Sequence, residues 1–176
     1  MKQILLASAM VLSGSAALAG GSHSSGHGHG DMMTDGDSDH HADMMAIGRP
    51  SDPENVTRVI EIKMMETEDG DMIFEPSVLE ITQGETIKFA IENIGEQEHE
   101  FVMDTMASVT EHKALMEEFP FMEHDDPNAV RLLPGEKAEI IWSFVNDGDF
   151  EFACLIPGHY ESGMHGPLAV IENPDS

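Results

Sequence analysis

The sequence predicts an all-β fold, a Greek-key β-sandwich or barrel with one short helical insertion and a disordered N-terminal extension. From about residue 54, apolar residues alternate with polar ones at a period of two, which is typical of strands that bury one face. Turn sequences rich in Gly, Asn and Asp separate about seven or eight such segments over roughly 120 residues, the spacing expected of a β-sandwich.

Residues 1–19 have the composition of a secretory signal peptide. Lys2 supplies a positive charge, an apolar run follows from Ile4 to Leu12, and Ala17-Leu18-Ala19 forms a small-residue cleavage site. The apolar run is short for a bilayer span, and no later segment approaches the required length. We therefore expect an exported protein without membrane insertion, in the periplasm because the signal is bacterial in character.

The segment 20–53 is expected to be a disordered extension, because Gly, Ser, Asp, His and Met dominate it and few aliphatic residues are available to bury. A solvated linker that happens to be rich in His is one interpretation. Thioethers suit Cu(I) and imidazoles accept Cu(II), so the clustering favours weak capture of additional copper. The side chains concerned are His23, His27, His29, Met32, Met33, His40, His41, Met44 and Met45.

One domain is expected over residues 54–176. Ile87, Phe89 and Ile91 illustrate the strand alternation, and the same pattern places Cys154 on a buried face at the end of a strand. His99 likewise shares a face with apolar residues, opposite a face that carries Glu98, Glu100 and Asp104. The predicted strands are 56–64, 72–74, 77–82, 86–92, 98–104, 139–144, 150–154 and 167–172.

A single helix is predicted between the strands 98–104 and 139–144. Ser108-Val109-Thr110-Glu111 has the pattern of a capping box, and apolar residues follow at helical spacing as far as Phe119. Some side chains in and after this helix could form a further weak metal site or only line the surface. They are His112, Met116, Met122 and His124.

The chain carries a formal charge of −26, from 34 acidic and 8 basic residues. Such a charge excludes nucleic acid and anionic membranes as partners and favours metal cations and a redox partner with a basic docking surface. Solubility in a salty or acidic setting explains the charge equally well. No feature requires an oligomer, and we expect a monomer.

Cys154 is the only cysteine, so in an exported chain it must pair with another chain, remain a free thiol or bind a ligand. His159 and Met164 follow it at equal spacing in one short loop, and His99 lies on a distant predicted strand. Each residue alone is explained equally well by packing or by surface exposure. Together they offer two nitrogens, a thiolate and a thioether, the ligand set of a blue-copper site. Zinc is the main competing metal, but thioether is a poor zinc ligand.

The segment Cys154–His159 with Met164 resembles the ligand loop of cupredoxins, the family of plastocyanin, azurin and rusticyanin, and is most similar to rusticyanin-like loops. Asn93-Ile94-Gly95 followed by His99 is similar to the family's upstream histidine segment. The resemblance covers roughly residues 56–172 and implies a Greek-key barrel with one type 1 copper ion. It implies His99 and His159 as equatorial ligands, Cys154 as the thiolate and Met164 as the axial ligand. The His- and Met-rich extension further resembles CopI-type periplasmic cupredoxins of bacterial copper tolerance.

Two positions near these ligands depart from the family pattern or offer an alternative. Family members often place Asn or Ser directly after the upstream histidine, where its side chain ties the two ligand loops together. This chain has Glu100 there, which leaves that hydrogen bond open. His165 is an alternative axial or surface ligand, and we expect it to be a bystander.

The family also implies that His159 lies near solvent as the port for electrons. Apolar neighbours would form a docking patch around it, although simple loop packing is the other interpretation. These neighbours are Leu155, Ile156, Pro157 and Tyr160.

The sequence favours a periplasmic copper-tolerance protein that binds copper and cycles it between Cu(I) and Cu(II). The alternative is an electron shuttle between respiratory redox partners, with the extension incidental. An enzyme is disfavoured, because multicopper oxidases need closely spaced His-x-His and His-Cys-His sequences across several domains. The one His-x-His sequence, His27-Gly28-His29, lies in the extension.

Overall fold

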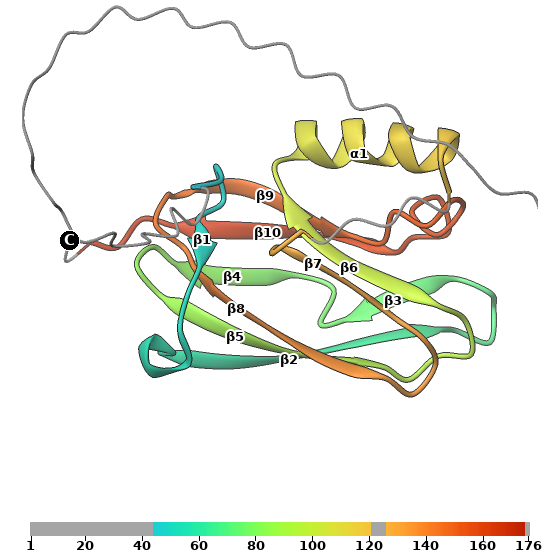
Figure 1. Cartoon of the computed structure of the whole chain (residues 1–176), viewed down its shortest axis with the longest axis horizontal. Coiled ribbons are helices and arrows are strands. Elements are labelled where there is room, and N and C mark those ends of the chain that lie inside the picture. The colour runs from blue at the N-terminus through green and yellow to red at the C-terminus, as the bar shows by residue number, and fades with distance from the viewer. Residues whose placement is uncertain (1–43, 121–125, 175–176) are drawn as a thin grey trace, which may run out of the picture. The chain divides into compact units, whose positions relative to one another are not determined.

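The structure, a computed structural model, describes residues 44–120 and 126–174. The predicted signal peptide 1–19 and residues 20–43 of the predicted extension lie outside the described residues. Within the described part, ten strands form two five-stranded sheets, and one helix lies beside the second sheet (Figure 1). The predicted all-β sandwich with one helical insertion is therefore confirmed.

The two sheets are built from strands that are distant in sequence. The order in the first sheet is β1-β8-β5-β2-β3, and in the second it is β4-β10-β9-β6-β7. The pairs β2–β5 and β4–β10 are parallel and the other pairs are antiparallel. The strands are β1 (Arg49–Pro50), β2 (Arg58–Glu66), β3 (Met72–Glu75), β4 (Leu79–Thr82), β5 (Thr86–Asn93), β6 (His99–Asp104), β7 (Ala129–Leu132), β8 (Lys137–Ser143), β9 (Gly148–Ala153) and β10 (His165–Ile171).

Residues before the boundary expected at residue 54 also belong to the folded part of the described chain. Ile47 is fully buried in the main core, and its carbonyl accepts a hydrogen bond of 3.3 Å from the indole Nε1 of Trp142. β1 then pairs with β8, with Arg49 opposite Ser143. The segment just before residue 54 thus contributes to the domain, and a short 3-10 turn at Pro53–Asn55 leads into β2.

The helix α1 (Met106–Glu118) begins two residues before the predicted capping box. Its N-cap is Thr105, whose hydroxyl accepts a hydrogen bond of 3.1 Å from the backbone N–H of Ser108. The prediction that Ser108 caps the helix is therefore wrong. Thr105 satisfies one of the free N–H groups at the helix start, as an N-cap residue does.

The helix lies against β6 and β9 (Figure 1), and β6 is buried on both faces from His99 to Met103. A second apolar cluster fills this layer and consists of Val102, Val109, Met116, Ala153 and Leu155. Glu100 lies on the face of β6 that carries Val102, opposite His99 as expected, but it is only 2% exposed although it is charged. The main core between the sheets contains Trp142 and most of the phenylalanines, and it reaches the loop that follows β9.

Candidate metal centre

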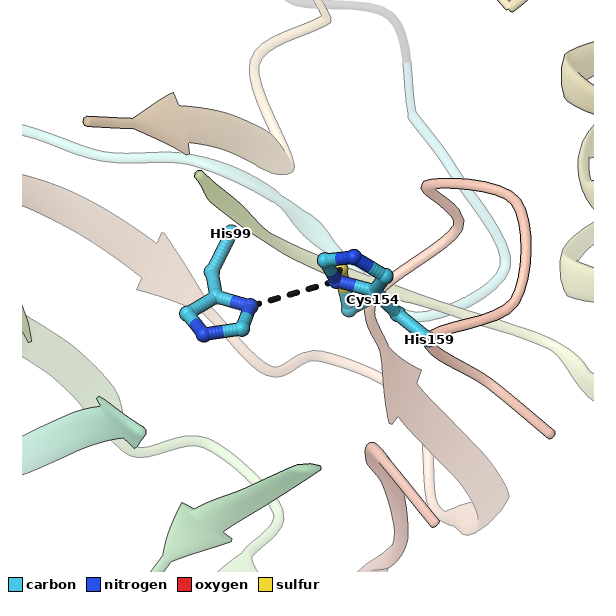
Figure 2. A group of neighbouring side chains, drawn as sticks. All are labelled: His99, Cys154 and His159. Atoms are coloured by element: carbon cyan, nitrogen blue, oxygen red, sulfur yellow. Dashed lines mark hydrogen bonds between the residues drawn. The ribbon is translucent and has the colours of Figure 1, made fainter. Parts of the chain in front are cut away.

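Three of the four predicted ligands converge in the structure. One ligand atom each from His99, Cys154 and His159 lies within 4.8 Å of the other two. The two Nδ1 atoms are 3.2 Å apart, and Sγ of Cys154 is 3.4 Å from Nδ1 of His159. Figure 2 shows the His99 and His159 rings joined by the contact between their Nδ1 atoms, with Cys154 beside the His159 ring. Among the residues that the structure describes, this is the one cluster of three or more His, Cys, Asp and Glu side chains with such spacing.

The register of β6 and β9 brings the first two side chains together. The strands are antiparallel, with Val102 opposite Ala153. His99 therefore begins β6 at the end where β9 finishes, and Cys154 directly follows β9. Both side chains are fully buried. A contact between residues so far apart in sequence is thus fixed by strand pairing rather than by a local loop.

The loop after Cys154 returns the chain so that His159 faces the sulfur. The N–H of His159 donates to the carbonyl of Ile156 at 3.0 Å, and Gly158 has a φ of 90°, the conformation that this turn requires and that glycine adopts without strain. The N–H of Cys154 donates to the carbonyl of Met164 at 2.9 Å, and the N–H of Met164 donates to the carbonyl of His159 at 3.1 Å. Met164 is fully buried beside both residues. Its sulfur as the axial ligand stays a prediction.

Glu100 links the two ligand-bearing segments. Its carboxylate accepts a hydrogen bond of 3.2 Å from the N–H of Leu155, and its own N–H donates to Sγ of Cys154 at 3.3 Å. The hydrogen bond that the sequence left open is therefore present, with a carboxylate as acceptor. Arg131 is the residue opposite Glu100 on β7, and its Nε forms an ion pair of 3.3 Å with Glu98.

The protonation states in this pocket are set mainly by burial. Burial raises the pKa of the Cys154 thiol to about 12, and the negative charge of Glu100 acts in the same direction. Burial also lowers the pKa of His159 and of His99, although the Glu66 carboxylate opposes this at both rings. At neutral pH the three groups are thus a neutral thiol and two neutral imidazoles.

This donor set fits copper. Two neutral imidazoles with converging Nδ1 atoms and a cysteine sulfur, with a thioether in the same loop, make up the ligand types of a blue-copper centre. A cation in the pocket would stabilise the thiolate and displace the thiol proton. The hydrogen bond from the N–H of Glu100 supplies further support to a negatively charged sulfur.

Sequence reasoning missed Glu66, the last residue of β2. Its carboxylate oxygen Oε1 lies 3.0 Å from Nε2 of His99. Burial acts to raise the pKa of Glu66, but backbone N–H donors, led by those of Glu96 and Gln97, outweigh it, and the net pKa lies below the usual value. No local motif identifies this residue, because 33 positions separate it from His99.

Three of the remaining candidate residues, His165, Met116 and His112, lie outside this cluster. His165 hydrogen-bonds through Nδ1 to Glu151 at 3.0 Å and stacks on Tyr160 with ring centroids 4.1 Å apart, so it is not in the cluster. Met116 is fully buried beneath α1, and His112 lines a hollow beside the helix. Met122 and His124 lie outside the described residues.

The apolar patch predicted around His159 is composed differently from expectation. Leu155 is only 1% exposed and packs beneath α1, so its assignment to a surface patch is wrong. Pro157 is exposed, and the exposed apolar side chains Ile94 and Leu133 lie on the two loops that adjoin β6 and β7. His159 itself is 7% exposed.

Comparison with known proteins gives consistent similarities. The model of copper-binding proteins of the plastocyanin/azurin family matches residues 61–171. The copper-resistant cuproprotein CopI of Rubrivivax gelatinosus is 43% identical over 145 residues, which cover 82% of this chain and 84% of that protein. The copper-resistant cuproprotein CopI of Pseudomonas aeruginosa is 34% identical, with 71% and 82% covered.

Solved structures of similar fold include the reduced auracyanin of Roseiflexus castenholzii. It superposes with a TM-score of 0.53 at 24% identity and covers 65% of this chain and 96% of its own. At this identity the likeness concerns the fold alone. None of the described helices has the length and apolar character needed to cross a membrane.

Proposed function

The chain belongs to the plastocyanin/azurin family of copper-binding proteins, and on this premise we propose that it is a periplasmic type 1 copper protein of copper tolerance. The resemblance predicted from the ligand loop is confirmed at the level of the family. Copper binding follows from the family. A single ion that cycles between Cu(I) and Cu(II) is the proposed detail, and the convergence of His99, Cys154 and His159 carries it.

Each residue has a distinct role in the proposed centre. His99 and His159 offer neutral Nδ1 donors, Cys154 a thiolate, and Met164 a weak axial thioether. Copper held by these groups would supply a reversible one-electron couple. The chain holds the donors in a buried pocket fixed by β6, β9 and one hydrogen-bonded loop, so little rearrangement accompanies a change of charge.

The protein is a copper-binding protein and not an enzyme, in keeping with its family and with the cuproproteins that it resembles. A role in tolerance draws support from the two relatives, both described as copper-resistant cuproproteins. The His and Met residues of the extension suit capture of additional copper ahead of the folded centre.

Spectra of the copper-loaded protein test the proposed centre. Visible absorption and electron paramagnetic resonance should show one thiolate-bound Cu(II) per chain, both in the mature protein and in a variant without residues 20–43. Additional Cu(II) signals should appear only in the protein that retains these residues. Absence of a thiolate-to-copper band from both proteins would refute the type 1 centre.

Deletion of the gene tests the physiological role. Growth at high copper should fail in the deletion strain and should be restored by the wild-type protein but not by Cys154→Ser. Normal tolerance combined with slowed respiration at low copper would refute the tolerance role and favour an electron shuttle.

One observation favours a second candidate function, an electron shuttle between redox partners. Ile94 is 48% exposed and Leu133 is 54% exposed, and they lie on loops next to β6, which carries His99, and its partner β7. Exposed apolar side chains beside a redox centre suit transient docking of a partner. Replacement of both by Ser should slow electron exchange with such a partner without changing the visible spectrum. Equal exchange rates would remove the support for the shuttle.

A further inference from the structure

We infer that Glu66 is a positioning residue of the metal centre, which fixes the tautomer of His99 and holds a negative charge behind it. The inference rests on the proposed copper centre. Oε1 of Glu66 lies 3.0 Å from Nε2 of His99, on the side of the ring opposite Nδ1. Since a carboxylate can only accept, Nε2 carries the proton and Nδ1 presents its lone pair to His159 and Cys154.

The carboxylate is held in place from several sides. Its Oε2 accepts a hydrogen bond of 2.8 Å from the N–H of Glu96, and its Oε1 accepts one of 2.9 Å from the N–H of Gln97. Three donors, two backbone amides and one imidazole, thus meet at this one side chain. A carboxylate so restrained acts on His99 from a fixed position rather than as a mobile surface charge.

The loop between β5 and β6 is shaped around this carboxylate. Gly95 approaches it so closely that an added Cβ would collide with it. Asn93, fully buried, donates its side-chain amide to the carbonyls of Gln97 and Leu132, and its own Oδ1 accepts from the N–H of Gly95. The turn Asn93-Ile94-Gly95 therefore does more than connect two strands, because it positions the N–H groups of Glu96 and Gln97 that donate to Glu66.

A negative charge at this position favours the more highly charged state of a metal on Nδ1. Ligand imidazoles commonly donate their other N–H to a carboxylate, which raises ring basicity and orients the ring. Cu(II) gains more from such a charge than Cu(I) does. The side chain of Glu66 is 18% exposed and lines a hollow of about 530 Å³ on the protein surface, so solvent weakens the effect without removing it.

Glu66→Gln, with Glu68→Gln as the control, tests the charge. Glu68 lies in the same hollow, is exposed, and its replacement changes the net charge equally. Loss of the Glu66 charge should weaken Cu(II) binding relative to Cu(I) by about tenfold, which corresponds to a rise of about 59 mV in the one-electron reduction potential. Glu68→Gln should give a much smaller shift. Equal shifts in the two variants would overturn the inference, because they would indicate only the general field of the surface.

Gly95→Ala tests the position separately from the charge. This variant retains every charge, but its added Cβ would collide with the Glu66 carboxylate, so we expect the carboxylate to leave its place beside His99. Its potential should rise by part of the Glu66→Gln shift. An unchanged potential in a variant that folds would overturn a role for the placement of the carboxylate.

A measurement on the metal-free protein separates this inference from the proposed function. Long-range ¹H–¹⁵N correlation spectra should show the Nε2–H tautomer of His99 in the wild type and a mixture of tautomers in Glu66→Gln. The Nδ1–H tautomer in the wild type would overturn the inference. Failure of the wild-type protein to give a copper-thiolate spectrum would refute the proposed centre, whereas these apo-protein spectra test the Glu66–His99 pair whatever that result.

Discussion

At the scale of single residues, the site depends on the Cys154 thiol, which stays protonated and unreactive in the absence of a metal ion. The Cys154 thiol is fully buried and its pKa is raised to about 12, so the metal-free protein protects this thiol from oxidation. The neighbouring imidazoles are neutral because burial lowers the pKa of each. Binding of a metal ion therefore has to displace only one proton, that of the Cys154 thiol.

Replacement of the sulfur tests the thiolate assignment. Cys154→Ser should abolish the thiolate-to-copper absorption band, because a hydroxyl cannot supply the charge-transfer donor. His165→Gln is the control, since it removes an imidazole that lies outside the cluster and should therefore retain the band. A full-strength band in the Cys154→Ser protein would contradict the ligand assignment.

Replacement of the thioether tests Met164. Met164→Leu keeps the volume and burial of the side chain but removes the axial sulfur. The visible band should remain, and the reduction potential should rise because a weak donor that favours Cu(II) is lost. Cyclic voltammetry of both proteins measures the shift. An unchanged potential would show that Met164 only packs in the core.

The raised thiol pKa predicts the pH dependence of metal binding. At about pH 7.5 the thiol is protonated and both imidazoles are neutral, so Zn²⁺ binding should release about one proton per ion. Affinity should therefore rise by about tenfold per pH unit across the neutral range. Calorimetry in buffers of different ionisation enthalpy, on protein without residues 20–43, counts the protons. Release of none would mean that the thiol is already ionised.

At the scale of elements, α1 completes the burial of the strands that carry the site. It packs on β6 and β9, and its buried residues Val109 and Met116 share a cluster with Leu155 of the ligand loop. The stability of the helix is thereby linked to the position of that loop. Its start depends on Thr105, whose hydroxyl caps the N–H of Ser108.

Removal of the cap tests this dependence. Thr105→Ala should reduce the free energy of unfolding by about 1 kcal/mol, because one N–H at the helix start loses its acceptor. Thr110→Ala is the matched control, since this exposed hydroxyl bonds only to the carbonyl of Met106 within the helix. Urea unfolding of the apo proteins measures both changes. Equal costs would contradict the cap assignment.

The elements also show what the sequence could and could not predict. The alternation in β5 and β8 predicted these strands well, because each buries one face with period two. β7 was missed because its burial does not alternate: three of its residues are half-buried and only Leu132 is buried. The helix start was misplaced because Thr105 and Ser108 both suit an N-cap. Burial of Glu100 accompanies its hydrogen bond with Leu155 in the loop after β9, a contact that alternation within one strand does not reveal.

The residues of the site likewise include some that the sequence predicted and one that it did not. His99, Cys154 and His159 were predicted because residue types that bind copper stand at the ends of strand-like segments. Glu66 was not predicted, because its contact with His99 arises from the pairing of β2 beside β5 and from the turn after Asn93. A hydrogen bond between distant strands leaves no local pattern in the sequence.

At the scale of the whole molecule, the boundary between extension and domain decides how the extension can be tested. Residues 44–50 belong structurally to the domain, since Ile47 is fully buried and β1 pairs with β8. Deletion of residues 20–43 removes most of the His and Met residues of the extension while it leaves these contacts intact. Deletion of residues 20–50 removes these His and Met residues and also the contacts of Ile47 and β1. Loss of tolerance in that variant could therefore come from lost copper capture or from lost stability.

The two truncations should therefore differ in stability. Protein without residues 20–43 should unfold at the same urea concentration as the mature chain, whereas protein without residues 20–50 should lose about 2–5 kcal/mol, as expected when a buried Ile side chain is removed. Ile47→Ala in the mature chain is the matched control and should reproduce most of that loss. If the capture role is correct, the shorter deletion lowers copper tolerance at unchanged stability, and full tolerance in that variant would contradict it.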